Sequence, residues 1–272
     1  MLTEKRMRPL CKEYENGATV KEICKREGIK EATFRWWLRK LKCNIRGRRV
    51  QTLDEKYFSS IDTQDKAYIL GFLMADGCVC KTGPTAKRPN RLFINISHKD
   101  RKILEYIKKE LKCSYEIVDY MPSEATYGNN MMSKLAINST PLCNDLAKYG
   151  IVARKTGIEK LPDLPSNMLP HFIRGFFDGD GTAYYCHKKY KDTTYRRLNI
   201  GFCSNYEMLS SIEDIFKSIG VKKYPKICAE KRTTGEFKNL YDISYGAKQD
   251  VKLIQHYMYD NANFFLKRKK LS

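Results

Sequence analysis

The sequence has 272 residues, of which 42% are apolar, and a formal net charge of +20 from 51 Lys or Arg and 31 Asp or Glu residues. This length allows one large domain or two to three small ones, and the apolar content is sufficient for hydrophobic cores. Such a strong positive charge points to a polyanionic partner, nucleic acid first and an anionic membrane second.

Several classes of protein are excluded. The charged N-terminus has no apolar signal core, and the longest apolar run, residues 67–75, is too short to span a bilayer. The ten cysteines include no Cys-x-x-Cys, and the four histidines complete no zinc pattern. We therefore expect an intracellular protein with reduced cysteines and no membrane partner.

The N-terminal part of the sequence predicts three short helices, at about residues 2–14, 20–27 and 31–41. Thr19 is the predicted N-cap of the second helix, which ends at Gly28. The turn after this helix and the basic positions of the third helix are typical of a helix-turn-helix, and they resemble the modules of transposases and resolvases. The alternative is a small helical bundle with a solvated basic face. The predicted DNA contacts are Lys30, Arg35, Arg39 and Lys40.

A basic segment follows these helices. Residues 1–50 contain 15 basic and 6 acidic residues, so a net charge of +9 lies in under a fifth of the chain. Arg46, Arg48 and Arg49 are predicted to form a linker or an arm that enters the DNA minor groove. We therefore assign residues 1–50 to a helix-turn-helix domain with its basic linker.

The rest of the sequence shows the same order of elements twice, in the halves 51–163 and 164–272. Each half begins with an apolar helix that ends at an Asp-Gly corner. A short strand, a Lys-rich loop, an alternating strand, an amphipathic helix, a hairpin and a further helix follow. Ser97 and Ser204 are predicted to start the amphipathic helices as capping boxes. One such apolar helix is ordinarily a core helix before a turn, but two copies in matching contexts indicate a functional pair.

The two Asp-Gly corners are predicted to meet. Small residues at positions 71, 75, 175 and 179 lie four apart on one face of each helix, where two backbones can approach closely. Packing the helices side by side would bring Asp76 and Asp180 together at one end. A carboxylate in the last turn meets the negative end of the helix dipole, so we expect a compensating positive group. The Gly after each acid fits a left-handed C-terminal cap.

Residues 69–77 and 173–181 resemble the nine-residue motif of the LAGLIDADG homing endonucleases. The second copy matches better, because Met74 replaces the sixth-position acid of the first. Both copies keep the eighth-position acid, which is the metal ligand in the family. The resemblance covers nearly all of residues 64–272 and implies an α+β fold. It would comprise two pseudo-symmetric α-β-β-α-β-β-α halves whose antiparallel sheets form a saddle over the DNA major groove, next to the small all-α helix-turn-helix domain.

In the alternating strands, Leu92, Ile94 and Ile96 of the first half would face the helices and leave polar residues on the other face. By the resemblance, this free face reads DNA, with Arg suited to guanine and Asn to adenine. The alternative is that these residues form only the solvated side of a sheet. The residues expected on the free faces are Arg91, Asn95, Ser97, Lys134, Asn138, Arg197 and Asn199.

The resemblance also implies the catalytic groups. Asp76 and Asp180, with the backbones of Ala75 and Gly179, would hold Mg²⁺ or Mn²⁺. Lys155 and Lys269 occupy equivalent positions in the repeat and would polarise the attacking water or steady the phosphate. Lys160 is an alternative to Lys155 in the first half.

The resulting hypothesis is a monomeric endonuclease that cuts both strands of double-stranded DNA at a long, nearly asymmetric site. Two alternatives stay open, an RNA maturase that binds an intron and a transcription regulator on the same scaffold. Retention of both acids, Asp76 and Asp180, argues against the regulator. It does not exclude the maturase, which can keep both.

Overall fold

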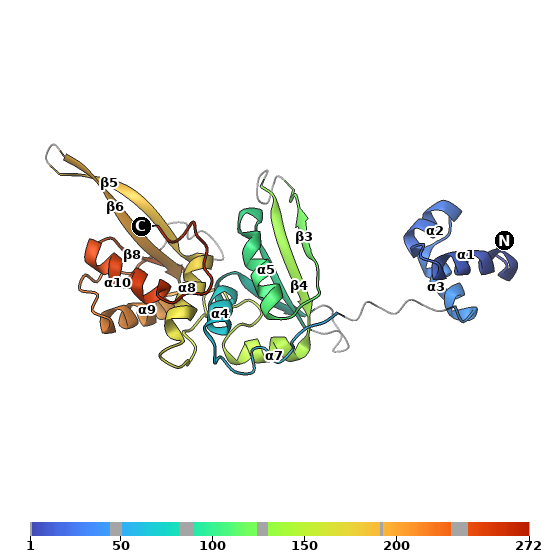
Figure 1. Cartoon of the computed structure of the whole chain (residues 1–272), viewed down its shortest axis with the longest axis horizontal. Coiled ribbons are helices and arrows are strands. Elements are labelled where there is room, and N and C mark those ends of the chain that lie inside the picture. The colour runs from blue at the N-terminus through green and yellow to red at the C-terminus, as the bar shows by residue number, and fades with distance from the viewer. Residues whose placement is uncertain are drawn as a thin grey trace. The chain divides into compact units, whose positions relative to one another are not determined.

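A computed structural model describes residues 2–43, 51–81, 90–123, 130–190, 193–229 and 239–271 (Figure 1). The chain divides into two compact units, Met1–Gln51 and Thr52–Ser272. Across the described residues, no helix combines the length and the apolar character that crossing a membrane requires. The predicted arginines 46, 48 and 49 lie outside the described residues.

The first unit contains the three predicted helices, α1 (Glu4–Glu15), α2 (Val20–Glu27) and α3 (Glu31–Lys40). The N-terminus of α2 has a complete capping box, because the Thr19 side chain accepts a hydrogen bond from the backbone of Glu22 and the Glu22 side chain accepts one from Thr19. A separate core holds the unit together, with Met7, Ile23 and Phe34 fully buried.

The second unit contains two copies of one arrangement, as the repeat predicts. The elements of the first copy are α4 (Gln64–Asp76), β1 (Gly77–Lys81), β2 (Asn90–Ser97), η1 (His98–Asp100), α5 (Arg101–Glu110), β3 (Ile117–Tyr120), β4 (Met132–Asn138) and α7 (Thr140–Lys148). Those of the second are α8 (Leu169–Asp180), β5 (Thr182–Tyr190), β6 (Thr193–Ser204), α9 (Tyr206–Ser218), β7 (Cys228–Ala229), β8 (Tyr241–Tyr245) and α10 (Lys248–Tyr259).

Each copy forms an antiparallel four-stranded sheet, in the order β1-β2-β4-β3 or β5-β6-β8-β7. Helices α4 and α8 pack against each other between the two sheets (Figure 1). One hydrophobic core joins both copies. The α+β prediction with two similar halves is therefore confirmed.

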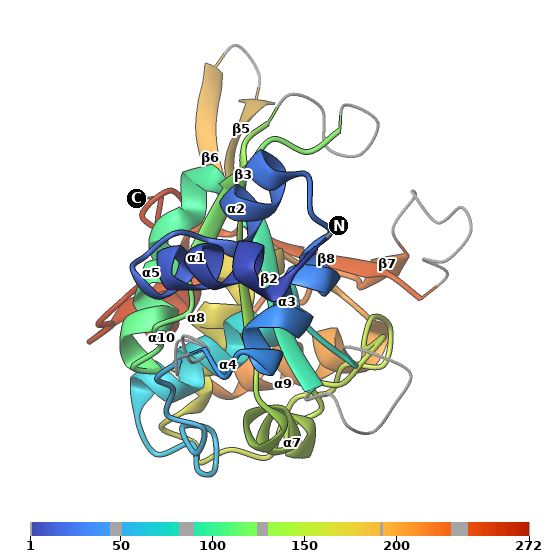
Figure 2. The same cartoon turned by 90° about the vertical axis from the view of Figure 1, so that its right-hand side faces the viewer.

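The alternation along β2 is also confirmed, since Leu92, Ile94 and Ile96 are buried and their neighbours are half-buried. Helices α5 and α7 pack on the buried side. In the second sheet, β6 pairs with β8 only over Ile200–Ser204, whereas its pairing with β5 continues to Tyr190. The β5–β6 hairpin consequently projects beyond its sheet (Figure 1 and Figure 2).

The predicted serine caps of the amphipathic helices are wrong. Asn205 caps α9, with its side-chain oxygen 2.9 Å from the backbone nitrogen of Met208. Ser97 makes no side-chain cap and precedes a 3₁₀ turn. The reason is that both serines still pair with the neighbouring strand, Ser97 with Met132 and Ser204 with Tyr241, so neither side chain caps an α-helix.

Candidate active site

The α4–α8 contact is as close as the small residues predict. A Cβ added at Gly71 would lie 2.0 Å from the carbonyl oxygen of Phe172, and one at Gly175 would lie 1.9 Å from that of Tyr68. Further along, a Cβ at Gly179 would lie 2.3 Å from the Cβ of Ala75. The two backbones therefore touch along one face, and only small residues fit between them.

This contact brings together Asp76 and Asp180, the last residues of the two helices. A Cβ at Gly179, the neighbour of Asp180, would lie only 3.2 Å from Oδ2 of Asp76. Burial by the surrounding protein raises the pKa of Asp76. Burial, and then the negative charge of Asp76, raise the pKa of Asp180 to about 7, although part of that side chain reaches solvent. Two carboxylates so placed favour a cation between them.

The expected left-handed glycine cap at each corner is wrong. Gly77 has φ −80° and Gly181 has φ −79°, both with extended ψ, so each helix leads directly into a strand. Glycine is required here for space, because a Cβ would lie 2.6 Å from the Leu73 carbonyl oxygen at Gly77 and 2.5 Å from the Phe177 carbonyl oxygen at Gly181.

The expected positive groups are two buried lysines. Lys155 donates to the carbonyl oxygen of Ala75 at 2.9 Å, at the end of α4. Lys269 donates to the carbonyl oxygens of Phe177 (3.1 Å), Gly179 (3.0 Å) and Gly181 (2.5 Å), at the end of α8. Each ammonium group therefore neutralises the negative end of a helix that terminates in an aspartate.

Burial lowers the pKa values of both lysines. That of Lys269 falls to about 8, with a further contribution from the adjacent Arg268, and that of Lys155 falls because of burial alone, since the nearby acids oppose the shift. With a pKa of about 8, Lys269 is still mostly cationic at neutral pH. The Ala75 and Gly179 carbonyl oxygens, which the resemblance assigns to metal binding, are thus already hydrogen-bonded to lysine.

Lys160, the alternative lysine of the first half, lies elsewhere. Its side chain is 70% exposed and forms an ion pair with Glu207 at 3.0 Å. Lys155, rather than Lys160, is therefore the lysine beside the paired acids.

The sequence reasoning did not single out Asp178, which lies in the last turn of α8, two residues before Asp180, and is 1% exposed. Its Oδ2 atom accepts hydrogen bonds from the Tyr68 hydroxyl and the Leu266 backbone, both at 2.7 Å. Burial raises its pKa to about 6. Because Leu266 precedes Lys269 by one turn of chain and accepts its backbone hydrogen bond, Asp178 anchors the segment that carries this lysine.

Two arginines hold the same C-terminal segment. Arg174 is fully buried and donates to the carbonyl oxygens of Phe264 (3.0 Å) and Met258 (2.9 Å). Arg268 forms a two-pronged ion pair with Asp100, at 2.8 and 2.6 Å, that ties the end of the second copy to the first. Arg174 and Asp178 are charged residues inside an otherwise apolar run, and this pattern was the sequence signal that could have identified both.

Known proteins resemble the chain in part of its sequence and in its fold. None of the curated proteins matches the chain in sequence. Residues 3–55 match a family of transposase helix-turn-helix domains. Among solved structures, the meganuclease I-SmaMI bound to uncleavable DNA has a TM-score of 0.52 at 14% identity, over 77% of this chain and 86% of that chain. The LAGLIDADG meganuclease I-CpaMI bound to uncleaved DNA has a TM-score of 0.50 at 13% identity, over 75% and 87%.

The fold of the second unit is that of the LAGLIDADG meganucleases. On this meganuclease fold, the first sheet gathers its predicted polar residues on the face away from the helices. The strand pairing sets Arg91 beside Asn138 and Asn95 beside Lys134. Arg91 donates to the Asn138 side chain at 2.8 Å, and Asn95 accepts from the Tyr120 hydroxyl at 3.0 Å. Ser97 continues the same face at the end of β2.

The second sheet departs from the expected free face. Arg197 and Asn199 lie on one side of β6, but Asn199 is only 9% exposed and donates to the Cys186 sulfur at 2.9 Å. The cause is Gly246, where an added Cβ would lie 2.0 Å from Oδ1 of Asn199 and 2.5 Å from a terminal nitrogen of Arg197. Both side chains therefore fold over this glycine, and Asn199 is less accessible than the alternation predicts.

In the first unit, the four predicted contacts lie on or next to α3. Lys30, Arg35, Arg39 and Lys40 are all exposed. Lys40 lies over the rings of Trp36 and Trp37, at 4.9 and 4.7 Å, and Trp36 is itself 50% exposed. Exposed basic residues beside an exposed indole form a surface that suits the backbone of a nucleic acid.

Proposed function

We propose that the chain is a divalent-cation-dependent endonuclease that cuts both strands of DNA. The observation that carries this proposal is the pair Asp76 and Asp180, which end two helices in backbone contact, each helix end being neutralised by a buried lysine. The net charge of +20 supports DNA as the partner. Because one chain carries both acids, a single molecule is sufficient for two cuts.

The donor set fits a hard divalent cation. Asp76 and Asp180 would hold it, since Mg²⁺ and Mn²⁺ prefer carboxylate oxygens and accept few protein ligands. The raised pKa values of both acids support this, because the two negative charges are costly until a cation joins them. Among the described residues, no third acid, His or Cys completes a larger metal cluster. Such a cation supplies Lewis acidity and positive charge at the scissile phosphate.

The two buried lysines differ in how many of their N–H donors the protein itself uses. An ammonium group has three N–H donors. Lys269 uses three on carbonyl oxygens, so its role is to fix and neutralise the end of α8. Lys155 donates one hydrogen bond within the described residues and keeps donors for a phosphate oxygen or an attacking water.

Target recognition would combine two surfaces. The outer sheet faces would offer Arg91, Asn95 and Lys134, and Arg197 if it moves off Gly246, to base edges and phosphates. Helix α3 would add contacts of the kind that a helix-turn-helix makes in the major groove. The two units would thus share one DNA molecule.

The test is cleavage of a randomised duplex library in Mg²⁺, followed by sequencing of the new ends. Asp180→Asn and Asp76→Asn keep the shape of each corner but remove the charge that holds the cation. We expect both variants to lose cleavage while still binding the selected duplex, with equal or higher affinity because an anion facing the phosphates has gone. Binding can be measured by fluorescence anisotropy.

Three results would contradict the proposal. One is wild-type cleavage by both Asn variants. Another is an absence of cleavage by the wild type together with selective binding of structured RNA, which would favour the intron-binding maturase. Binding to duplex DNA without cleavage would favour the transcription regulator.

A further inference from the structure

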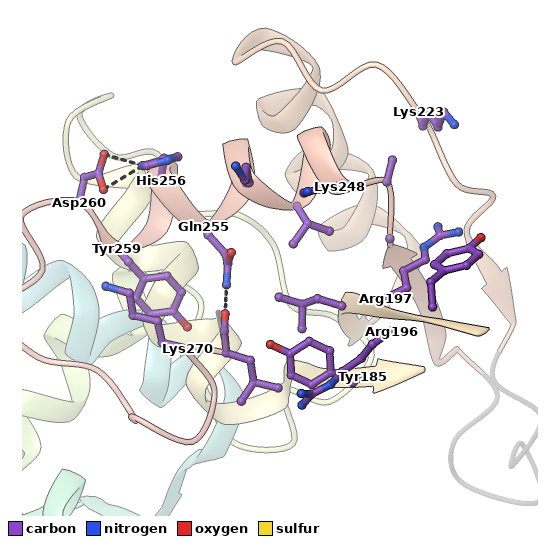
Figure 3. Close-up of a pocket in the computed structure, with 17 residues that line it drawn as sticks. Tyr185, Arg196, Arg197, Lys223, Lys248, Gln255, His256, Tyr259, Asp260 and Lys270 are labelled. Carbon is purple, nitrogen blue, oxygen red and sulfur yellow. Dashed lines mark hydrogen bonds and ion pairs between the residues drawn. The ribbon is translucent and has the colours of Figure 1, made fainter. Parts of the chain in front are cut away.

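A cavity of about 970 Å³ lies between the β5–β6 hairpin and α10 (Figure 3). Leu198, Val251 and Leu271 give it apolar walls. Its lining comes from both strands of the hairpin and from α10, and Tyr185 pairs with Leu198 across the two strands. None of the paired acids or buried lysines of the candidate active site lines this cavity.

The charges around the cavity are nearly all positive. Its one carboxylate, Asp260, lies 3.3 Å from Nδ1 of His256. The labelled cations lie on several sides of the cavity rather than around one point (Figure 3). This distribution suits a chain of phosphates better than one compact anion. The cationic residues of the lining are Arg196, Arg197, Lys223, Lys248, Lys252 and Lys270.

Aromatic rings accompany these cations. The guanidinium of Arg196 lies 3.4 Å from the ring centre of Tyr185, and the ammonium of Lys270 lies 5.3 Å from that of Tyr259. Tyr195 is 47% exposed and Tyr185 is half-buried, whereas Tyr259 is buried. Exposed rings and planar cations are the groups on which unpaired bases stack, with little regard to sequence.

We propose that this cavity binds a short segment of single-stranded nucleic acid. The volume lies in the range of pockets that enclose small ligands, so it accommodates a few nucleotides and excludes a duplex. The cations would follow the phosphates while Tyr185 and Tyr195 contact bases. The proposal does not depend on the endonuclease activity, because the cavity and the paired acids share no residue.

The test compares two double variants of the full chain. Arg196→Gln with Lys252→Gln removes two exposed cations of the cavity, and Arg197 is left intact because it also belongs to the predicted duplex-binding face. The matched control is Lys102→Gln with Lys109→Gln, which removes two exposed cations from α5, outside the cavity. Thermal unfolding verifies that both variants fold.

The probes are labelled oligothymidylate and oligouridylate of about twelve nucleotides, with a labelled duplex beside them. For the cavity variant, the slope of log affinity against log salt for the single strands should fall by about 1.4, or 0.7 for each phosphate that the variant no longer neutralises, which weakens binding by roughly tenfold or more at 0.1 M salt. Duplex binding should be unchanged, and the control variant should match the wild type. Tighter binding of one oligomer identifies DNA or RNA as the source of the strand.

Three outcomes would overturn the proposal. The first is an equal loss in the cavity and control variants, which would reflect net charge alone. The second is an equal loss of duplex and single-strand binding. The third is displacement of the oligomers by adenosine triphosphate at the same concentration as by unlabelled oligomer, which would make the cavity a site for small phosphates.

Discussion

At the scale of single residues, the two buried lysines should respond differently to substitution. Lys269→Met removes the lysine donor from three carbonyl oxygens, of which that of Phe177 keeps the Gly181 N–H, whereas Lys155→Met removes it from one. Each buried group left unsatisfied costs about 1–3 kcal/mol. We therefore expect Lys269→Met to lower the urea midpoint strongly and Lys155→Met to lower chiefly the cleavage rate. Parallel urea unfolding and cleavage assays measure both quantities. The reverse order would contradict the assignment of donors.

The carboxyl of Asp180 should make stability depend on pH. Its pKa of about 7 in the folded protein lies above the ordinary value of about 3.9, so between these values the folded state holds a proton that the unfolded state has lost. Without metal, stability should fall as pH rises through this window, and the raised pKa of Asp76 acts in the same direction. The lowered pKa of Lys269 changes stability in the opposite direction, and only from about pH 8 upward.

Thermal unfolding in EDTA at pH 5 and pH 8 measures this effect. The fall in Tm should be smaller in Asp180→Asn than in the wild type, and added Mg²⁺ should raise the wild-type Tm more at pH 8 than at pH 5. Titrating groups far from Asp180 cancel in the comparison. Identical pH dependence in the two proteins would contradict the raised pKa.

At the scale of elements, Gly175 should reject even a methyl group. In an ordinary helix, Gly→Ala stabilises by about 1 kcal/mol. In α8, the added Cβ would lie 1.9 Å from the Tyr68 carbonyl oxygen, a clash against backbone that cannot relax without separating the helices. Gly175→Ala should therefore lower the free energy of unfolding by about 1–3 kcal/mol or more. A urea midpoint at or above that of the wild type would show that the two helices pack more loosely.

Several elements were predictable because one local pattern determined each. The period-2 pattern of β2 gave its buried face, and the small residues of α4 and α8 gave their close contact. Features set by distant parts of the chain were not predictable. The serine caps failed because both serines stay paired in a sheet, and Asn199 is buried because Gly246, far along the chain, leaves space for it.

In the candidate site, too, features set by a local pattern were predictable and features set by distant parts of the chain were not. Asp76 and Asp180 were predicted to meet because the small residues four apart on each helix mark the faces that pack together. The sequence left Lys155 and Lys160 open, since only the folded chain decides which of them reaches the end of α4. Asp178 was missed because its partners, Tyr68 and Leu266, come from two other segments.

At the scale of the whole molecule, the two units have separate cores and should separate in function. Deleting residues 1–50 removes a net charge of +9 and the exposed cations of α3. We expect duplex affinity to fall, and the slope of log affinity against log salt to decrease by about 0.9 for each phosphate that the shortened protein no longer neutralises. Cleavage at saturating protein should persist, because the paired acids lie in the second unit.

Arg35→Ala with Arg39→Ala in the full chain is the matched control for this deletion. These two side chains are exposed on α3, so the variant should lose part of the salt slope, by about 1.8 if each arginine neutralises one phosphate, while the unit itself stays in place. Anisotropy titrations at several salt concentrations give the slopes, and single-turnover assays give the cleavage rate. A truncated protein that folds, binds the target at saturation and yet does not cut would show that the first unit takes part in the reaction.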